Sequence, residues 1–338
     1  MSDISKKKIC LTGVKPTGMP HLGNYIGAIK PAIDNVNKSD MEGYFFIADY
    51  HSLITIHDGE ILRNDIYEVA ATWLAAGLDP NKAILYKQSD IPEITELNWI
   101  ISCFASKGLM NRAHAYKAKK DKNAEENRDE DFGINMGLFS YPVLMAADIL
   151  FMNTDYVPVG EDQLQHIEIA RDIASSFNHK FGDLLTLPEA IVSKAENKLL
   201  PGLDGRKMSK SYGNHIPCFV PEKKLKKMIN KITTDSTPPE APKNPDESLI
   251  FDIYKFFATS EEQDALAKRY QEGIGWGHAK LELFEVLNRE LTPMREKYEA
   301  LMADKSQIDT ILAQGAAKIR PIAQENLRRI KKAIGVSN

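Results

Sequence analysis

The chain has 338 residues, of which 43% are hydrophobic and 27% charged, with a formal net charge of -4. This composition is typical of a water-soluble chain that is long enough for one large or two moderate hydrophobic cores. The small negative charge excludes a protein that holds nucleic acid by overall positive charge, but it leaves room for a local basic face.

The cysteines and the amino terminus indicate the compartment. Cys10, Cys103 and Cys218 are scattered and lack metal-ligand spacing, so we interpret them as reduced thiols of a cytoplasmic protein. Residues 1–8 contain no apolar signal core, and no uncharged stretch is long enough to cross a bilayer. We therefore expect neither secretion nor a membrane partner.

The first informative stretch, residues 12–27, follows the apolar run 9–14 and is rich in glycine and proline. A strand is expected to end here and a helix to begin, because apolar residues recur at helical spacing. These residues are Leu22, Ile26, Ile29 and Ile33. His21, Gly23 and Asn24 would then occupy the amino end of the helix, where unpaired N–H groups and the helix dipole favour an anion such as phosphate.

The next segments predict an α/β fold. The apolar runs 44–49 and 83–88 are expected to be buried strands, and the segment 61–77 between them has helical spacing and a closing glycine. A helix over 93–106, a strand at 156–159 and a helix through 167–174 continue the pattern. Alternating strands and helices predict a parallel, Rossmann-like sheet that binds its ligand at the carboxyl edge.

The remaining segments predict an insertion, a loop and a helical carboxyl-terminal part. The insertion covers about 107–140 and includes the mixed-charge run 117–131, which we interpret as exposed and mobile. Residues 202–213 place glycines around a serine and lysine cluster, as expected of a loop that moves. Helical patterns follow near 222–232, 247–258, 261–272, 278–303 and 307–334. We therefore predict a catalytic domain over 1–220 and a helical domain over 221–338.

Two motifs carry a family resemblance. The segments 21–24 (His-Leu-Gly-Asn) and 207–211 (Lys-Met-Ser-Lys-Ser) resemble, in the correct order, the two signature motifs of class I aminoacyl-tRNA synthetases. Three further segments are similar to the bacterial-type tryptophanyl-tRNA synthetases, namely 49–55, 141–150 and 157–166. One short motif is weak evidence, but five in order make chance similarity remote. The likeness extends over nearly the whole chain.

The resemblance implies a ligase that activates L-tryptophan with ATP and then transfers it to the 3′ end of tRNA(Trp). It also implies a helical domain that reads the anticodon, a homodimer, and Mg²⁺ carried with ATP, although no protein ligand cluster for a metal is visible. The attacking carboxylate is already an anion, so positioning and neutralisation of phosphate charge should dominate catalysis.

The resemblance assigns catalytic roles to four residues. His21 is expected to donate to phosphate, and Lys207 and Lys210 to pair with the leaving pyrophosphate on a loop that closes. Lys119 is a further phosphate contact by family position, although Lys117 and Lys120 lie beside it. The expected ATP-binding group is Lys15, Pro16, Thr17, Gly23, Asn24, Gly160, Glu161, Asp162, Leu199, Lys207, Met208, Ser209, Lys210 and Ser211. The plainer alternative is a capped helix followed by a solvated loop.

Asp148 is the candidate for recognition of the amino acid. A carboxylate in the apolar run 143–151 is costly to bury without a donor, and an indole N–H is donor only. The resemblance makes the indole its partner, whereas a surface aspartate bonded to backbone or arginine is the alternative. Met145, Val157 and Val159 are expected to form apolar walls around the tryptophan side chain. Tyr141 and Gln163 are expected to hold its ammonium group, and His51 is a candidate on the carboxylate side.

The chain departs from the family pattern at two positions. Many relatives have glutamine where this chain has Lys15 and threonine where it has His21. We hypothesise that Lys15 adds a cation facing the tryptophan carboxylate or the α-phosphate. For tRNA the sequence offers two basic helix faces, one at 223–227 and one at 318–332.

Three other functions remain compatible with the sequence. A tyrosine-specific relative would have the same fold and chemistry. A small-metabolite adenylyl- or cytidylyltransferase also uses a histidine and glycine motif, but it has no need of the long helical domain. A non-catalytic paralogue should have lost His21, Lys207 and Lys210, all of which are present.

Overall fold

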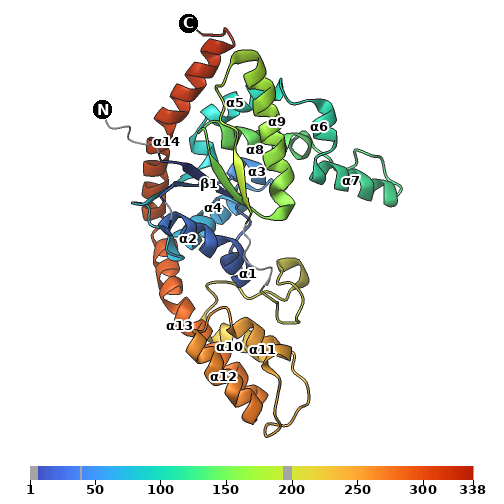
Figure 1. Ribbon diagram of the computed structural model, residues 1–338, viewed down its shortest axis with the longest axis vertical. Helices are drawn as coiled ribbons and strands as arrows, with labels where there is room; N and C mark the ends of the chain where they lie inside the picture. Colours follow the sequence, from blue (N-terminus) through green and yellow to red (C-terminus); the bar gives the residue numbers. More distant parts are fainter. Residues whose placement is uncertain (1–6, 39, 193–199, 338) are drawn as a thin grey trace.

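The fold is built on a parallel sheet. The computed structural model describes residues 7–38, 40–192 and 200–337 (Figure 1). Its five strands lie in the order β3-β2-β1-β4-β5, and all neighbours are parallel. The strands are β1 (Ile9–Val14), β2 (Glu42–Ile47), β3 (Ala83–Lys87), β4 (Tyr156–Val159) and β5 (Glu189–Val192). The predicted α/β class is confirmed, and the strand order reverses between β1 and β4.

Helices cover the sheet, which explains the apolar strand sequences. In β2 the side chains from Tyr44 to Ile47 are all buried, as expected of a strand with both faces covered. The helices before the loop at 202–213 are α1 (Leu22–Asn24), α2 (Lys30–Lys38), α3 (Asp49–Ser52), α4 (Gly59–Ala75), α5 (Glu93–Ser102), α6 (Lys107–Asn111), α7 (His114–Glu125), α8 (Met136–Leu150) and α9 (Leu164–Phe181). Those after it are α10 (Glu222–Asn230), α11 (Leu249–Tyr254), α12 (Ser260–Glu272), α13 (Trp276–Ala303) and α14 (Lys305–Ala333).

The helix expected after β1 contains a wide turn. A π-helical segment, η1 (Tyr25–Ile29), separates α1 from α2. Pro31 lies two residues after this segment, as the second residue of α2; its nitrogen has no N–H to donate, and its ring would clash with a carbonyl of the preceding turn in a regular α-helix. Widening the backbone before Pro31 relieves this conflict. Such turns are frequent near functional sites.

The insertion is mainly helical. Figure 1 shows α6 and α7 reaching outward from the body of the molecule. Asn123 is fully buried near the end of α7, and its Nδ2 donates to the carbonyl oxygens of Glu130 and Phe132, both at 2.9 Å. Most side chains of the charged run are exposed, as predicted, but the helix and its folded-back turn were not predicted.

The carboxyl-terminal helices return to the first part of the chain. Figure 1 shows α10, α11 and α12 gathered at one end, while α13 and α14 run back along the sheet. α13 packs against α4, and α14 packs against β3 and α5. Ion pairs join α14 to α5, at 3.2 Å between Arg320 and Glu93 and at 2.7 Å between Lys331 and Glu96. A functional division at residue 220 stays a prediction.

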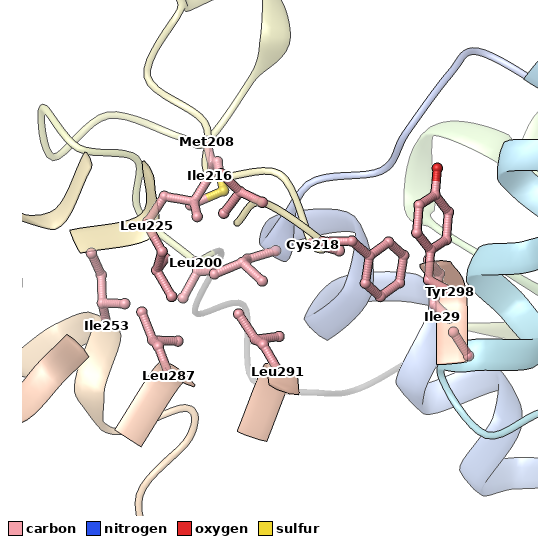
Figure 2. Packing of buried hydrophobic residues seen from close by; sticks show 14 of the residues in the cluster. Ile29, Leu200, Met208, Ile216, Cys218, Leu225, Ile253, Leu287, Leu291 and Tyr298 are labelled. Carbon is pink, nitrogen blue, oxygen red and sulfur yellow. The ribbon is translucent and has the colours of Figure 1, made fainter. Parts of the chain in front are cut away.

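A hydrophobic cluster joins the loop after β5 to the helical part. Figure 2 shows Met208 and Ile216 packed toward Leu225 of α10 and Leu287 of α13. The ring of Phe219 stacks on Tyr298 with centroids 4.3 Å apart. Buried apolar side chains therefore anchor the segment 208–219 to the helical part. None of the described helices combines the length and apolar character needed to cross a bilayer.

The contact between α14 and β3 gives a testable prediction. A Cβ atom at Gly315 would lie only 1.9 Å from the carbonyl oxygen of Leu85, so Gly315→Ala must push the helix away from the strand. We expect a loss of about 1–3 kcal/mol in the free energy of unfolding, the usual range for overpacking. Denaturant titration measures it. The control is Gly277→Ala in α13, where nothing lies within 4 Å of the new methyl group; equal stability of the two variants would contradict the close packing.

Candidate active site

A cavity lies at the carboxyl edge of the sheet, at the point where the strand order reverses. Its volume is about 500 Å³, which suits an amino acid side chain, and open parallel sheets bind ligands at this position. Nine of the predicted site residues line it: Lys15, His51, Tyr141, Met145, Asp148, Val157, Val159, Gly160 and Gln163.

Asp148 is fully buried at this cavity. Its carboxylate accepts from Nε2 of Gln88, at 2.7 Å to Oδ1 and 2.9 Å to Oδ2, and Nε2 of His51 lies 2.9 Å from Oδ2. Burial raises the pKa of Asp148, and the contacts with His51 and Gln88 oppose that rise. The alternative of a surface aspartate is wrong. Because His51 uses Nε2 here, only its Nδ1 remains for a ligand.

A second set of hydrogen bonds near Asp148 joins the segment that follows β2 to the segment that follows β3. Oε1 of Gln88 accepts from the backbone N–H of Tyr50 at 3.1 Å. The buried carboxylate of Asp49 accepts from the backbone N–H groups of Tyr50 and Ser89, both at 3.1 Å, and from the Ser89 hydroxyl. The segments that follow these two strands are thus held in one arrangement.

Further lining residues of the cavity come from α8, which also carries Asp148, from β4 and from the segment after β4. The Tyr141 hydroxyl lies 2.6 Å from Nε2 of His166, whose pKa is lowered mainly by burial. Gln163 donates to Asp162 at 2.9 Å. Burial also lowers the pKa of Lys15, which lies at the end of β1.

His21 caps α1 at the other side of the site. Its Nδ1 accepts from the backbone N–H of Asn24, and the Asn24 side chain accepts from the backbone N–H of His21, each at 3.2 Å. Because Nδ1 is an acceptor, the proton of the neutral ring resides on Nε2, which is then a donor. Burial, together with His215, Lys210 and Lys207, lowers the pKa of His21 to about 4.

The structure places the two signature segments side by side. The backbone N–H of Leu22 donates to Ile216 at 2.9 Å, and that of Cys218 donates to Pro20 at 3.0 Å. A Cβ atom at Gly23 would lie 3.0 Å from two atoms of the His21 ring and 3.4 Å from Cβ of Met208, so the glycine leaves room for the capping imidazole beside the loop. The two motifs, which are remote in sequence, therefore lie close together in the fold, as the resemblance requires.

The loop 202–213 lies over the turn that follows β1. Nζ of Lys210 donates to the carbonyl oxygen of Thr17 at 2.8 Å, and Ser209 Oγ lies 2.8 Å from Ser211 Oγ. The loop is fixed from within by Asn214, which accepts from the Ser209 N–H at 2.8 Å and donates to Asp204 at 2.7 Å. Lys207 is exposed beside these contacts.

Residues 15–17 connect the cavity to the phosphate side. Lys15 lines the cavity, the carbonyl oxygen of the buried Pro16 accepts from Ser52 at 3.2 Å, and Thr17 accepts from Lys210. A ligand with an apolar part in the cavity and a phosphate near His21 would therefore pass this turn.

The remaining predicted residues lie in three places. Glu161 and Asp162 are exposed in η3 (Glu161–Gln163), directly after β4 and Gly160. Lys119 lies on α7, one turn beyond the cavity residue Ala115, and its amine is near Gly133. Leu199 lies outside the described residues. Among the described residues, Glu161, Asp162 and Lys119 form no hydrogen bond or ion pair with Lys207 or Lys210, and the roles of these residues and of Leu199 stay predictions.

Sequence reasoning missed two residues that hold the site. Gln88 begins η2 (Gln88–Asp90) directly after β3, and a polar residue at the carboxyl end of a buried parallel strand was an available signal. Asn214 follows the signature loop, and no sequence pattern singles it out. In the ranges 7–38, 40–192 and 200–337, no three His, Cys, Asp or Glu side chains form a group that could hold a metal ion.

The environment of His21 makes its titration a test. We expect its NMR titration midpoint near 4, far below the ordinary value of 6.5, because burial and the neighbouring cations disfavour the charged ring. The unfolded chain binds this proton near 6.5, so the stability that the neutral ring contributes is lost as pH falls from 6.5 toward 4. His21→Asn identifies the resonance and should weaken that pH dependence. A midpoint at or above 6.5 would show that the surroundings do not hold the ring neutral.

The chain resembles known proteins over nearly its whole length. The model of the family of tRNA synthetases class I (W and Y) matches residues 4–292. The tryptophan–tRNA ligase of Neisseria meningitidis is 53% identical, with 98% of this chain and 99% of the relative covered, and that of Pseudomonas aeruginosa is 52% identical over 96% and 73%.

A solved structure supports the same relationship. The tryptophanyl-tRNA synthetase of Campylobacter jejuni complexed with ADP and tryptophan has a TM-score of 0.89 and 46% identity, covering 97% of this chain and 99% of that one. The chain therefore belongs to the class I tRNA synthetase family of the tryptophan and tyrosine enzymes, within which it groups with the bacterial tryptophan–tRNA ligases.

Proposed function

We propose that the chain is a tryptophan–tRNA ligase, which forms tryptophanyl-adenylate and pyrophosphate from L-tryptophan and ATP and then charges tRNA(Trp). The observation that carries this proposal is a fully buried acceptor, Asp148, in an apolar cavity next to the paired signature segments. Tryptophan satisfies this cavity because its ring is apolar and its indole nitrogen only donates.

The amino acid would lie with its indole against Asp148 and its backbone toward the turn after β1. Met145, Val157 and Val159 would be the apolar walls. Tyr141 and Gln163 would hold the ammonium group, and Lys15 and His51 would lie on the carboxylate side of the ligand. This arrangement leaves the carboxylate pointing to the phosphate side of the site.

ATP would bind across residues 15–17, the amino end of α1 and the loop. The first step is attack of the tryptophan carboxylate on the α-phosphorus, which releases pyrophosphate. No base is required, because the nucleophile is already ionised. His21 would donate through Nε2, and Lys207 and Lys210 would neutralise the leaving charge. Lys210 must exchange the Thr17 carbonyl for phosphate, so the loop has to shift when ATP binds.

Other ATP contacts belong to the same proposal. Gly23 and Asn24 would lie under the phosphates, Ser209 and Ser211 would add donors, and Met208 would anchor the loop. Gly160, Glu161 and Asp162 would accept from the ribose, Lys119 would reach a phosphate, and Leu199 would contact the adenine. Mg²⁺ would arrive bound to ATP, and we place the reaction in the cytoplasm.

Basic residues of both α10 and α14 would contact the tRNA. Lys223, Lys224 and Lys227 of α10 are exposed, and none forms an ion pair within the described residues. In α14, Arg320, Arg328 and Lys331 pair with glutamates of the protein itself, whereas Lys318, Arg329 and Lys332 are exposed and form no ion pair within the described residues. Ion pairs of this kind reduce the positive charge available to a phosphate backbone.

A homodimer is the proposed assembly. Trp99 on α5 is 73% exposed, an unusual position for so large an apolar side chain, and aromatic residues are enriched at protein interfaces. Covering this face with a second copy would bury it. Sedimentation equilibrium should give twice the mass of one chain, and Trp99→Glu should shift the protein toward monomer; a monomeric wild-type chain would contradict the assembly.

Exchange of labelled pyrophosphate into ATP, measured with each amino acid in turn, tests the function. We expect exchange with tryptophan and very little with tyrosine or phenylalanine. Asp148→Ala should lower kcat/KM for tryptophan at least about 100-fold, because a hydrogen bond to a charged group is worth about 1.5–3 kcal/mol and the loss also unbalances its buried partners.

Two variants serve as comparisons in that assay. Asp264→Ala removes an exposed carboxylate of α12 and should leave exchange unchanged. Lys15→Gln should raise the KM for tryptophan or ATP if its cation faces either ligand, and unchanged constants would make it a bystander. Full activity of Asp148→Ala would refute the choice of specificity residue, whereas exchange with tyrosine alone would refute the tryptophan assignment.

A further inference from the structure

We propose that Gln88 is a positioning residue for amino acid recognition, which holds Asp148 in the one orientation that offers a single free acceptor to the ligand. This inference rests on the proposed function, because it concerns how the same cavity selects an indole. Gln88 itself is 0% exposed and does not line the cavity, so it acts through Asp148 rather than on the ligand.

The orientation of the Gln88 amide is set by the main chain. Its Oε1 lies 3.1 Å from the backbone nitrogen of Tyr50, which can only donate. The amide nitrogen must therefore face the opposite way, toward Asp148, where it lies 2.7 Å from Oδ1 and 2.9 Å from Oδ2. A flipped amide would place its oxygen, an acceptor, against the acceptor oxygens of the carboxylate and leave the Tyr50 N–H facing a donor.

Counting acceptor positions shows what remains for a ligand. An ionised carboxylate offers about four lone-pair positions. Gln88 engages one on each oxygen, and His51 Nε2 engages the second on Oδ2. One position is left, on Oδ1. Asp148 lines the cavity, so this position suits one N–H donor such as that of an indole ring.

The titratable groups around Asp148 show why its carboxylate depends on Gln88. The titratable groups that face Asp148 are His51 and Asp49 of α3 and Tyr86 of β3, and Lys87 in turn acts on Asp49. Among the described residues no lysine or arginine pairs with Asp148. Burial raises the pKa of its carboxyl group, Asp49 adds to the rise, and only His51 and Gln88 lower it.

Replacing the amide by an apolar side chain of similar size tests the role. In Gln88→Met the carboxylate loses the Gln88 donor that contacts both of its oxygens, so its pKa should rise further. We expect the KM for tryptophan in pyrophosphate exchange to increase about tenfold at mildly alkaline pH, as for loss of a hydrogen bond to a charged group. The increase should grow as pH falls, because protonation removes the acceptor. The kcat at saturating tryptophan should change much less.

A second variant should have the opposite pH dependence. Gln88→Glu keeps the shape and the acceptor for Tyr50 but places a carboxyl group against Asp148. Two close carboxyl groups share one proton at low pH and repel each other when both are ionised. The KM for tryptophan should therefore improve on acidification, because the shared proton restores a donor between the two groups.

Gln324→Met is the matched control. It removes an amide that donates to a carboxylate, Glu93, at 2.9 Å on the contact between α14 and α5, away from the cavity. Its KM should follow that of the wild type at every pH. If Gln88→Met does not fold, Gln88→Glu alone decides by the sign of its pH dependence.

The outcomes separate the two proposals. If the wild-type chain shows no tryptophan-dependent exchange, the proposed function fails. If it does, and the KM of both Gln88 variants runs parallel to the wild-type pH profile, the positioning role is overturned while the function stands. Opposite slopes for the two variants establish the role, since a purely structural defect has no reason to change sign.

Discussion

The close approach of residues 20–24 to residues 207–218 is the contact on which the site depends. Two backbone hydrogen bonds, from Leu22 to Ile216 and from Cys218 to Pro20, join parts of the chain that are about two hundred residues apart in sequence. Met208 and Ile216 then continue into the hydrophobic cluster of α10 and α13. The loop 202–213 is therefore held both by the start of the first helix and by the helical end of the molecule. The proposed sharing of one ligand by the imidazole of His21 and the amine of Lys210 depends on this contact.

The two halves of the site solve different electrostatic problems. In the proposed amino acid cavity a buried carboxylate would have to stay available as an acceptor, and Gln88 and His51 hold it. On the proposed phosphate side, burial together with His215 and the nearby lysines lowers the pKa of His21, so its Nε2 could donate without adding another cation to the basic loop. In both halves the polar groups are oriented before the ligand arrives, and preorganisation of this kind is the main source of electrostatic catalysis.

Much of this arrangement could be predicted from sequence. Strands β1 to β4 were predicted because they are nearly continuous apolar runs, whereas β5 was not, since its four residues begin with the exposed Glu189. α7 was missed because its dense charge hides any apolar stripe. The cavity residues were named by resemblance, but the partners of Asp148 were not. Gln88 lies 60 positions away in sequence, and only the strand order brings its amide to the carboxylate.

The last helix has a consequence for how the chain matures. α14 packs on β3, the outer strand of the sheet, with the backbone of Gly315 against that of Leu85. During synthesis the strand emerges more than two hundred residues before its cover does. The nascent sheet thus keeps an unprotected edge until α14 has been synthesised, and a product truncated before α14 would leave that edge open to aggregation.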